Sequence, residues 1–146
     1  MASARWTNWS TYKKLQIDAA DGSGPLTTAI YNWEDSWSFN LGVSYDYGPD
    51  WTFRAGYVFD QSPIKDEYRV PSIPDNDRNA IALGFSYRPM ANLSVDFGYM
   101  HIWFKSASTD ENLNLISAYP GLVTQNLLLD YDNSADIVGI QGTYRF

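Results

Sequence analysis

The sequence predicts an all-β membrane protein in which antiparallel strands cross a bilayer as a segment of a transmembrane β-barrel. Three observations lead to this prediction. Apolar residues alternate with small or polar ones over long runs, aromatic residues make up 16% of the 146 residues, and short and long connections alternate along the chain. Membrane barrels combine these features, because every second strand side chain faces lipid and aromatic residues gather at both membrane surfaces.

Composition excludes several other classes of protein. The net charge is -7, whereas nucleic-acid binding needs a basic face, so no nucleic-acid partner is expected. The chain has no cysteine, which excludes disulfides and thiolate metal sites. It also has no run of about eighteen apolar residues, so no transmembrane helix is predicted.

A period of two residues marks the predicted strands. From Trp33 to Tyr47 the odd positions are apolar or aromatic, apart from Asp35, and the even positions are small or polar. Successive strand side chains point to opposite faces, so the sheet has one apolar and one polar face. The first predicted strand is rich in Trp, Thr and Tyr but alternates less cleanly. The six predicted strands are residues 5–17, 33–47, 51–60, 78–88, 93–105 and 136–146.

The polar face and the connections distinguish a membrane barrel from a soluble sandwich, which also alternates. The polar face is rich in Gly, Ala and Ser and lacks the Lys and Glu of a sheet face exposed to water. Residues 47–50 and 88–92 predict tight turns, whereas the connections 18–32, 60–77 and 106–135 are long. Outer-membrane barrels have short periplasmic turns and longer extracellular loops. The sequence therefore predicts a bacterial outer-membrane protein whose last strand descends to the periplasm.

The two ends of the chain support this interpretation. Tyr144 and Phe146 place aromatic side chains at the third-last and last positions, an ending that resembles outer-membrane barrels and implies recognition by the barrel-assembly machinery. Residues 1–5 do not resemble an export leader, so we expect a removed leader or a piece of a longer protein. About eight strands is the lower limit for a barrel. Missing N-terminal strands or another chain are therefore expected to close it.

Two motifs in the middle of the chain carry a family resemblance. Asp60-Gln61-Ser62-Pro63 is followed by Ile73-Pro74-Asp75-Asn76-Asp77-Arg78, and the strand Leu93 to His101 comes next. Together with the final strand, these segments resemble the C-terminal third of the FadL and TodX family of outer-membrane transporters. The resemblance implies a barrel of roughly fourteen strands. It also implies a plug and a lateral gap outside this chain, and passive diffusion of long-chain fatty acids or other hydrophobic compounds through the lumen.

Candidate ligand-binding residues lie on the predicted inner face. Met100, Ile102 and Phe104 make that face apolar near the outer end of the fifth strand, which predicts either an apolar ligand pocket or packing against a plug. Arg54 and Arg88 also face inward. Each is expected to bind a fatty carboxylate or, as the simpler alternative, to pair with an acidic side chain of the wall. The acidic candidates for that pairing are Glu34, Asp46 and Asp96.

A further candidate is the connection from Asn112 to Tyr131, which is unusually apolar for an extracellular loop. Its leucines, among them Leu115, Leu122 and Leu127, are expected to capture hydrophobic substrate or, alternatively, to extend the two flanking strands. Long loops also leave open an alternative function, a structural or surface-interaction barrel that contacts host or phage without transport. The outer-membrane lipid and lipopolysaccharide are expected partners in either case.

No cofactor, metal or enzymatic activity is predicted. A Ca²⁺ site is considered for four loop carboxylates, but their spacing matches no recognised calcium loop. They are expected instead to order the segment 72–78 with Arg69 and Arg78. The one histidine, His101, falls on the outward face, away from any inward serine, so a serine hydrolase site is not expected. The four carboxylates are Asp60, Asp66, Asp75 and Asp77.

Overall fold

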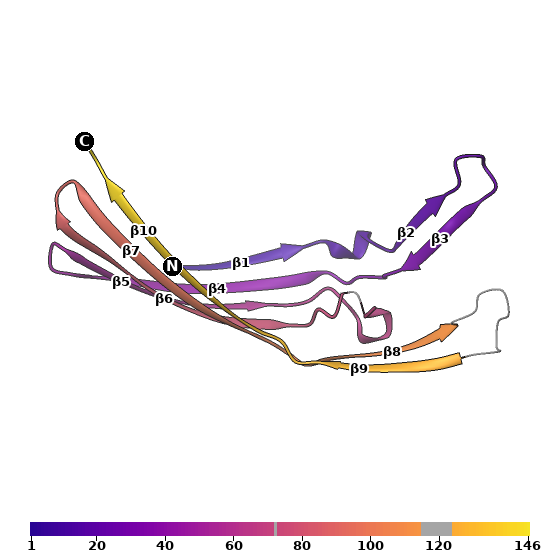
Figure 1. Cartoon of the computed structure of the whole chain (residues 1–146). Helices are drawn as coiled ribbons and strands as arrows, with labels where there is room; N and C mark the ends of the chain where they lie inside the picture. The colour runs from indigo at the N-terminus through magenta and orange to yellow at the C-terminus, as the bar shows by residue number, and fades with distance from the viewer. Residues whose placement is uncertain (72, 115–123) are drawn as a thin grey trace.

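A single antiparallel sheet of six strands dominates the structure, a computed structural model that describes residues 1–71, 73–114 and 124–146. The strand order is β1-β4-β5-β6-β7-β10, so each strand pairs with its neighbour in a meander (Figure 1). This confirms the predicted all-β, antiparallel fold. The strands are β1 (Ala2–Thr7), β4 (Ser36–Tyr47), β5 (Trp51–Asp60), β6 (Arg78–Met90), β7 (Leu93–Phe104) and β10 (Ser134–Tyr144).

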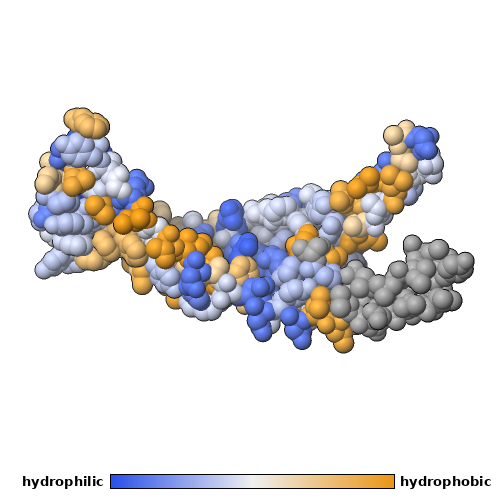
Figure 2. Space-filling model, in the orientation of Figure 1, coloured by the Kyte–Doolittle hydropathy of each residue, from blue (hydrophilic) through white to orange (hydrophobic). Residues whose placement is uncertain are grey.

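The two faces of this sheet follow the predicted alternation. Large apolar side chains at the odd positions of β4 to β7 point outward and are exposed or half-buried; Val43 is 63% and Leu83 is 55% exposed. In β10 the same face carries the even positions, and Ile140 is 79% exposed. Figure 2 shows hydrophobic residues gathered over the strands. A contiguous apolar face of this kind is suited to lipid rather than to water.

Two hairpins extend from the end of the sheet that carries the long connections. One pairs β2 (Lys14–Asp18) with β3 (Pro25–Ile30), and the other pairs β8 (Ala107–Asn114) with β9 (Thr124–Tyr131). Both lie at the same end of the molecule (Figure 1). The sequence predicted β3, β8 and β9 as parts of long connections, whereas most of β2 fell within the first predicted strand, residues 5–17. Within the described residues no helix is long and apolar enough to cross a bilayer; the helical turns are η1 (Trp9–Thr11) and η2 (Asp66–Tyr68).

The first predicted strand, residues 5–17, was wrong in its extent. The chain leaves the sheet after Thr7, turns through η1 and enters β2 of the separate hairpin. An aromatic cluster explains the break: the ring of Trp33 packs against Trp9 and Tyr12 at centroid distances of 5.3 and 4.9 Å. Because Trp33 is held in this cluster, the strand predicted from residue 33 begins only at Ser36.

Short turns close the opposite end of the sheet, as predicted. Gly48 adopts a φ of 66° in the turn between β4 and β5, a left-handed conformation that glycine enters without steric penalty. The turn between β6 and β7 is formed by Ala91 and Asn92. All three long connections therefore lie at the other end, which is the extracellular end by the usual geometry of outer-membrane barrels.

Two glycines of the inner face allow a test of how tightly the sheet is packed. A Cβ added at Gly84 would lie 2.9 Å from the backbone oxygen of Phe97, whereas one added at Gly98 would meet no atom within 4 Å. Gly84→Ala is expected to destabilise the complete barrel by about 1–3 kcal/mol, because the clash is with backbone. Gly98→Ala is the matched control and is expected to be nearly neutral. Urea unfolding in lipid vesicles, followed by tryptophan fluorescence, measures both; equal stabilities would contradict the packing.

Candidate functional site

The strand register arranges the inner side chains in layers across the sheet. Paired residues lie at one height, and successive inward residues of a strand are about 7 Å apart. From the turn end upward, the first two layers read Asp46–Thr52–Ser86–Asp96–Gln141 and Ser44–Arg54–Gly84–Gly98–Gly139. The next two read Gly42–Gly56–Ala82–Met100–Ile137 and Asn40–Val58–Ala80–Ile102–Ala135.

The upper two of these layers form an apolar band on the inner face. Met100 and Ile102 lie in the band, as the sequence predicted, and both are half-buried. Phe104 lies one layer higher, opposite Arg78. We call the eight carbon-rich or glycine residues of β5, β6, β7 and β10 in these layers the apolar band; they are Gly56, Val58, Ala80, Ala82, Met100, Ile102, Ala135 and Ile137.

Below the band, hydroxyl groups connect the two predicted arginines to acidic side chains. The Arg54 guanidinium donates to Ser86 Oγ at 2.7 Å, and Ser86 Oγ donates in turn to Asp96. Arg54 therefore reaches an acidic side chain of the wall, but only through a serine hydroxyl. Exact register, which the sequence does not reveal, creates this connection.

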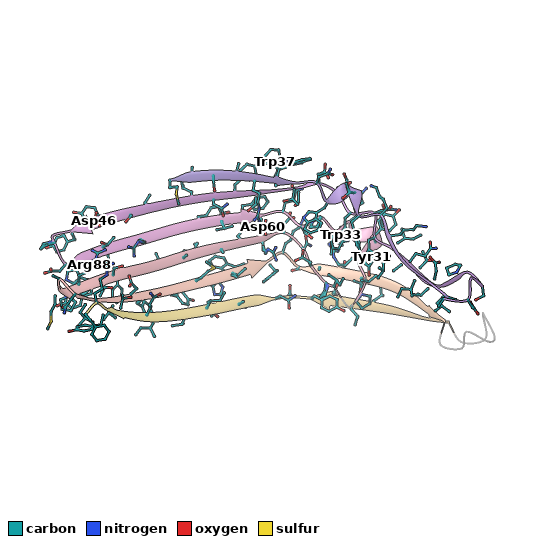
Figure 3. The ribbon with its side chains drawn as sticks, turned by 90° about the horizontal axis from the view of Figure 1, so that it is seen from above. Tyr31, Trp33, Trp37, Asp46, Asp60 and Arg88 are labelled. Atoms are coloured by element: carbon teal, nitrogen blue, oxygen red, sulfur yellow. The ribbon has the colours of Figure 1, made fainter. Side chains whose placement is uncertain are left out.

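Arg88 is held in the same way, one strand away. It donates to Thr52 Oγ1 at 3.3 Å, and Thr52 Oγ1 donates to Asp46 at 2.7 Å. Arg88 and Asp46 lie near the turn end of the sheet, far from Asp60 and Trp33 (Figure 3). Within the described part of the chain, no ion pair joins either arginine to a carboxylate. Both guanidiniums therefore keep donors available to the lumen.

Above the band lies a layer of fully paired charges. Arg78 donates to Asp60 through Nε and NH2 at 2.9 and 2.7 Å, and its third nitrogen lies 3.8 Å from Asp75. Arg5 approaches the same Asp60 at 4.0 Å. Both hydrogen bonds end on one oxygen, Asp60 Oδ2, and charge-assisted bonds of this kind are stronger than neutral ones. These charges therefore fix the mouth of the wall and leave little capacity for a ligand.

A cavity of about 400 Å³ lies beside these charges and is bordered by Trp9 and Trp33. The indole Nε1 of Trp33 is buried and has no hydrogen-bond partner among the residues that the structure describes. Aromatic packing therefore holds the Trp33 ring, which also lies 5.8 Å from the Tyr31 ring, while the Trp33 backbone N–H donates to the Tyr12 carbonyl at 3.2 Å. Figure 3 shows Trp33 and Tyr31 close together near the base of the β2–β3 hairpin.

The loop between β5 and β6 is organised around one buried arginine. The side chain of Arg69 is 1% exposed and donates to the backbone oxygens of Asp75 and Ser108 at 3.0 and 3.2 Å, while pairing with Asp66 at 2.7 Å. Arg69 thus ties the loop to β8. At the loop surface, Glu34 accepts a hydrogen bond from Lys65 at 2.7 Å, which raises the pKa of Lys65 above its ordinary 10.5.

The predicted loop carboxylates do order this segment. Asp77 accepts a hydrogen bond from the Ser62 backbone N–H at 2.9 Å, and Asp75 accepts one from the Ser62 hydroxyl at 2.9 Å. Glu34, considered as an inward partner for an arginine, instead pairs with Lys65. Among the residues for which positions are described, no three His, Asp or Glu side chains are grouped to hold a metal ion.

The apolar loop predicted as a capture surface is only partly described. Leu115 and Leu122 lie outside the described residues, and Leu127 lies in β9 opposite Glu111. His101 lies on the outward face, where its Nδ1 is 2.6 Å from Asp136. Sequence reasoning missed Thr52 and Ser86, whose roles depend on strand register. It expected Arg69 to order the loop with the carboxylates, but it did not foresee the contact of Arg69 with Ser108 of β8.

The family follows from comparison with known proteins. Residues 1–146 match the family model described as outer membrane protein transport protein (OMPP1/FadL/TodX). The chain belongs to this family. It is an outer-membrane protein, which confirms both the predicted resemblance and the predicted location.

Individual relatives agree with this assignment. The 47 kDa outer membrane protein of Pasteurella multocida is 31% identical over 99% of this chain and 30% of its own length. The long-chain fatty acid transport protein of Escherichia coli K12 is 37% identical over 68% of this chain and 22% of its own length. The crystal structure of a Pseudomonas aeruginosa FadL homologue superposes with a TM-score of 0.80 at 28% identity, over 98% of this chain and 31% of that one. The chain thus spans less than a third of these relatives.

Replacing Arg69 tests whether it organises the outer loop. Arg69→Met keeps the length of the side chain but leaves the Asp75 and Ser108 carbonyls without their donor, which costs about 1–3 kcal/mol per group. Faster proteolytic cleavage within residues 61–77 of the complete barrel is expected. Lys65→Met is the control, since it removes a partly exposed ion pair worth about 0–1 kcal/mol. Equal cleavage rates in the two variants would rule out this role for Arg69.

Proposed function

We propose that this chain forms part of the wall of a barrel through which long-chain fatty acids or related hydrophobic carboxylates diffuse passively across the outer membrane. The observation that carries the proposal is the position of Arg54 directly beneath the apolar band. A ligand with a hydrocarbon tail and one carboxylate needs an apolar surface and a cation next to each other. The family and the name of the Escherichia coli relative support the same class of substrate.

Open space beside Arg54 supports a role in binding rather than in packing. Its layer contains Gly84, Gly98 and Gly139, and a Cβ added at either of the last two would meet no atom within 4 Å. Arg54 is an exposed residue, and its guanidinium donates to one serine hydroxyl within the described residues. A carboxylate that enters this space would form a charge-assisted hydrogen bond with Arg54.

The apolar band would hold the adjoining part of the tail. Two layers span about 14 Å, so a long tail also needs apolar surface on strands beyond these six. β1 and β10 leave unpaired edges among the described strands, and strands corresponding to the rest of the longer relatives would close the wall. Arg88, nearer the turn end, would receive the carboxylate as the ligand moves toward the periplasm. No chemical transformation is needed in such a pathway, so we propose no enzymatic activity.

The end of β10 fits a role in assembly of this barrel. Tyr144 and Phe146 pack edge to face at 5.1 Å, and both side chains are exposed. We propose that this aromatic pair is recognised by the barrel-assembly machinery before insertion. Once the strand is inserted, the same pair would lie at the periplasmic surface of the membrane.

A second function, surface contact without transport, is favoured by one observation. The β2–β3 hairpin exposes Leu26 and Ile30 at 72% and 56%, and Figure 2 shows hydrophobic residues over this hairpin. Deletion of residues 14–30 would abolish adhesion to host cells or phage and leave fatty-acid uptake intact if this function dominates. Loss of uptake together with unchanged adhesion would support transport.

The transport proposal is tested by separating head-group binding from tail binding. Arg54→Gln in the complete barrel is expected to weaken oleate binding about tenfold or more, because a hydrogen bond to a charged group is lost, worth about 1.5–3 kcal/mol. Binding of oleyl alcohol, which has the same tail without the charge, is expected to change little. Isothermal titration in detergent measures both ligands.

Arg145→Gln is the matched control, because Arg145 lies beyond β10 near the turn end, remote from the apolar band. It is expected to leave the affinity for oleate unchanged. An equal loss of oleate and oleyl alcohol affinity in Arg54→Gln would contradict a role in carboxylate binding. If the unaltered barrel showed no saturable binding of oleate, the proposed function as a whole would be contradicted.

A further inference from the structure

The outward face of the six strands carries one histidine and one carboxylate, and these two residues are neighbours. Strand parity places His101 of β7 and Asp136 of β10 on the lipid-facing side, where the register pairs them directly. All other outward residues of these strands are apolar, aromatic or uncharged. Ionisable residues are costly on a lipid-facing surface, so their presence here points to a function.

These two residues form a connected cluster with their neighbours. Asp136 Oδ1 accepts a hydrogen bond from the Tyr99 hydroxyl at 2.6 Å and lies 2.6 Å from His101 Nδ1. The ring of Trp103 packs edge-on against His101 at a centroid distance of 4.3 Å. Because a carboxylate only accepts hydrogen bonds, Nδ1 carries a proton in this contact. His101 Nε2 and the second oxygen of Asp136 remain available, since both described bonds use Oδ1.

The height of the cluster indicates which lipids it meets. His101 and Asp136 lie three residues from the end of β7 and two residues from the start of β10, at the extracellular end of the sheet. At the same level the Tyr57 hydroxyl donates to Asn79 at 2.5 Å, which extends the polar surface to β5 and β6. At the opposite end the outward residues Tyr47, Trp51 and Tyr87 provide aromatic surface without charge. The cluster thus lies at the end of the sheet that carries the long connections, which corresponds to the outer leaflet by the usual geometry of outer-membrane barrels.

We propose that Tyr99, His101 and Asp136 form a binding site for the head group of lipopolysaccharide, the glycolipid of the outer leaflet. Its phosphorylated amino-sugar head group carries hydroxyl and amide N–H donors, which suit the free Asp136 oxygen. Its phosphate accepts from His101 Nε2 when the ring is protonated, and Trp103 packs beside the sugar and the first acyl carbons. The apolar outward face below the cluster covers the acyl chains. The site rests on the outer-membrane location and not on the proposed transport.

Lipid binding to the complete, delipidated barrel in detergent tests the site. Native mass spectrometry would follow binding of purified lipid A over a concentration series. Asp136→Asn retains one carbonyl acceptor for Tyr99 and His101 but removes the free acceptor, and is expected to weaken lipid A binding about tenfold. Tyr47→Phe is the control, since it removes an outward hydroxyl at the opposite end of the sheet, and is expected to bind lipid A unchanged.

Two further measurements identify which lipid is bound and show whether a loss of binding is caused by a folding defect. Phosphatidylethanolamine, a zwitterionic phospholipid, is expected to bind the unaltered barrel more weakly than lipid A and to be insensitive to Asp136→Asn. His101→Gln provides a second variant with the same expected loss of lipid A affinity. Unchanged lipid A binding in both variants, or phosphatidylethanolamine binding as tight as that of lipid A, would overturn the proposal.

Discussion

Backbone hydrogen bonding in lipid is the constraint on which this structure depends. No water is present in the hydrocarbon region to satisfy backbone N–H and C=O groups, so each spanning strand must pair with its neighbours. The register between β4 and β5 accordingly runs without interruption from Ser38 opposite Asp60 to Tyr47 opposite Trp51. Once the strands are paired, the alternation of side chains assigns each residue to lipid or to lumen. Arg54 and His101 have different environments because they face opposite sides of the same sheet.

Register adds the second coordinate, the depth of each side chain in the membrane. The paired charges of Asp60 and Arg78, the apolar band and Arg54 follow one another at different heights of the inner face. A shift of one residue in β5 would move Arg54 to the lipid face, which costs about 2–4 kcal/mol near the middle of a bilayer. The same shift would turn the Phe53 side chain toward the lumen. The arrangement of the candidate site is therefore a consequence of the register that lipid exposure enforces.

The sequence predicted the features that depend on local patterns and missed those that depend on contacts between distant segments. A period of two is local, so it predicted the faces of Arg54, Met100 and His101 correctly. Short motifs and turn residues are also local, and they predicted the family and the positions of the tight turns. The end of the first strand at Thr7 depends on packing between Trp9 and Trp33, and the β5–β6 loop depends on Arg69 reaching Ser108. These contacts join distant segments and leave no periodic signal. The hydroxyl of Ser86 likewise acquires its role only from exact register.

Accessibility at adjacent positions of one strand tests most directly the claim that the sheet separates lipid from lumen. The chain has no cysteine, so nitroxide labels can be attached to Val43→Cys and Ser44→Cys in the complete barrel in lipid vesicles. The account predicts that the label at residue 43 collides mainly with oxygen dissolved in lipid, and that the label at residue 44 collides mainly with a water-soluble nickel complex. The same accessibility at both positions, or the reverse order, would contradict it.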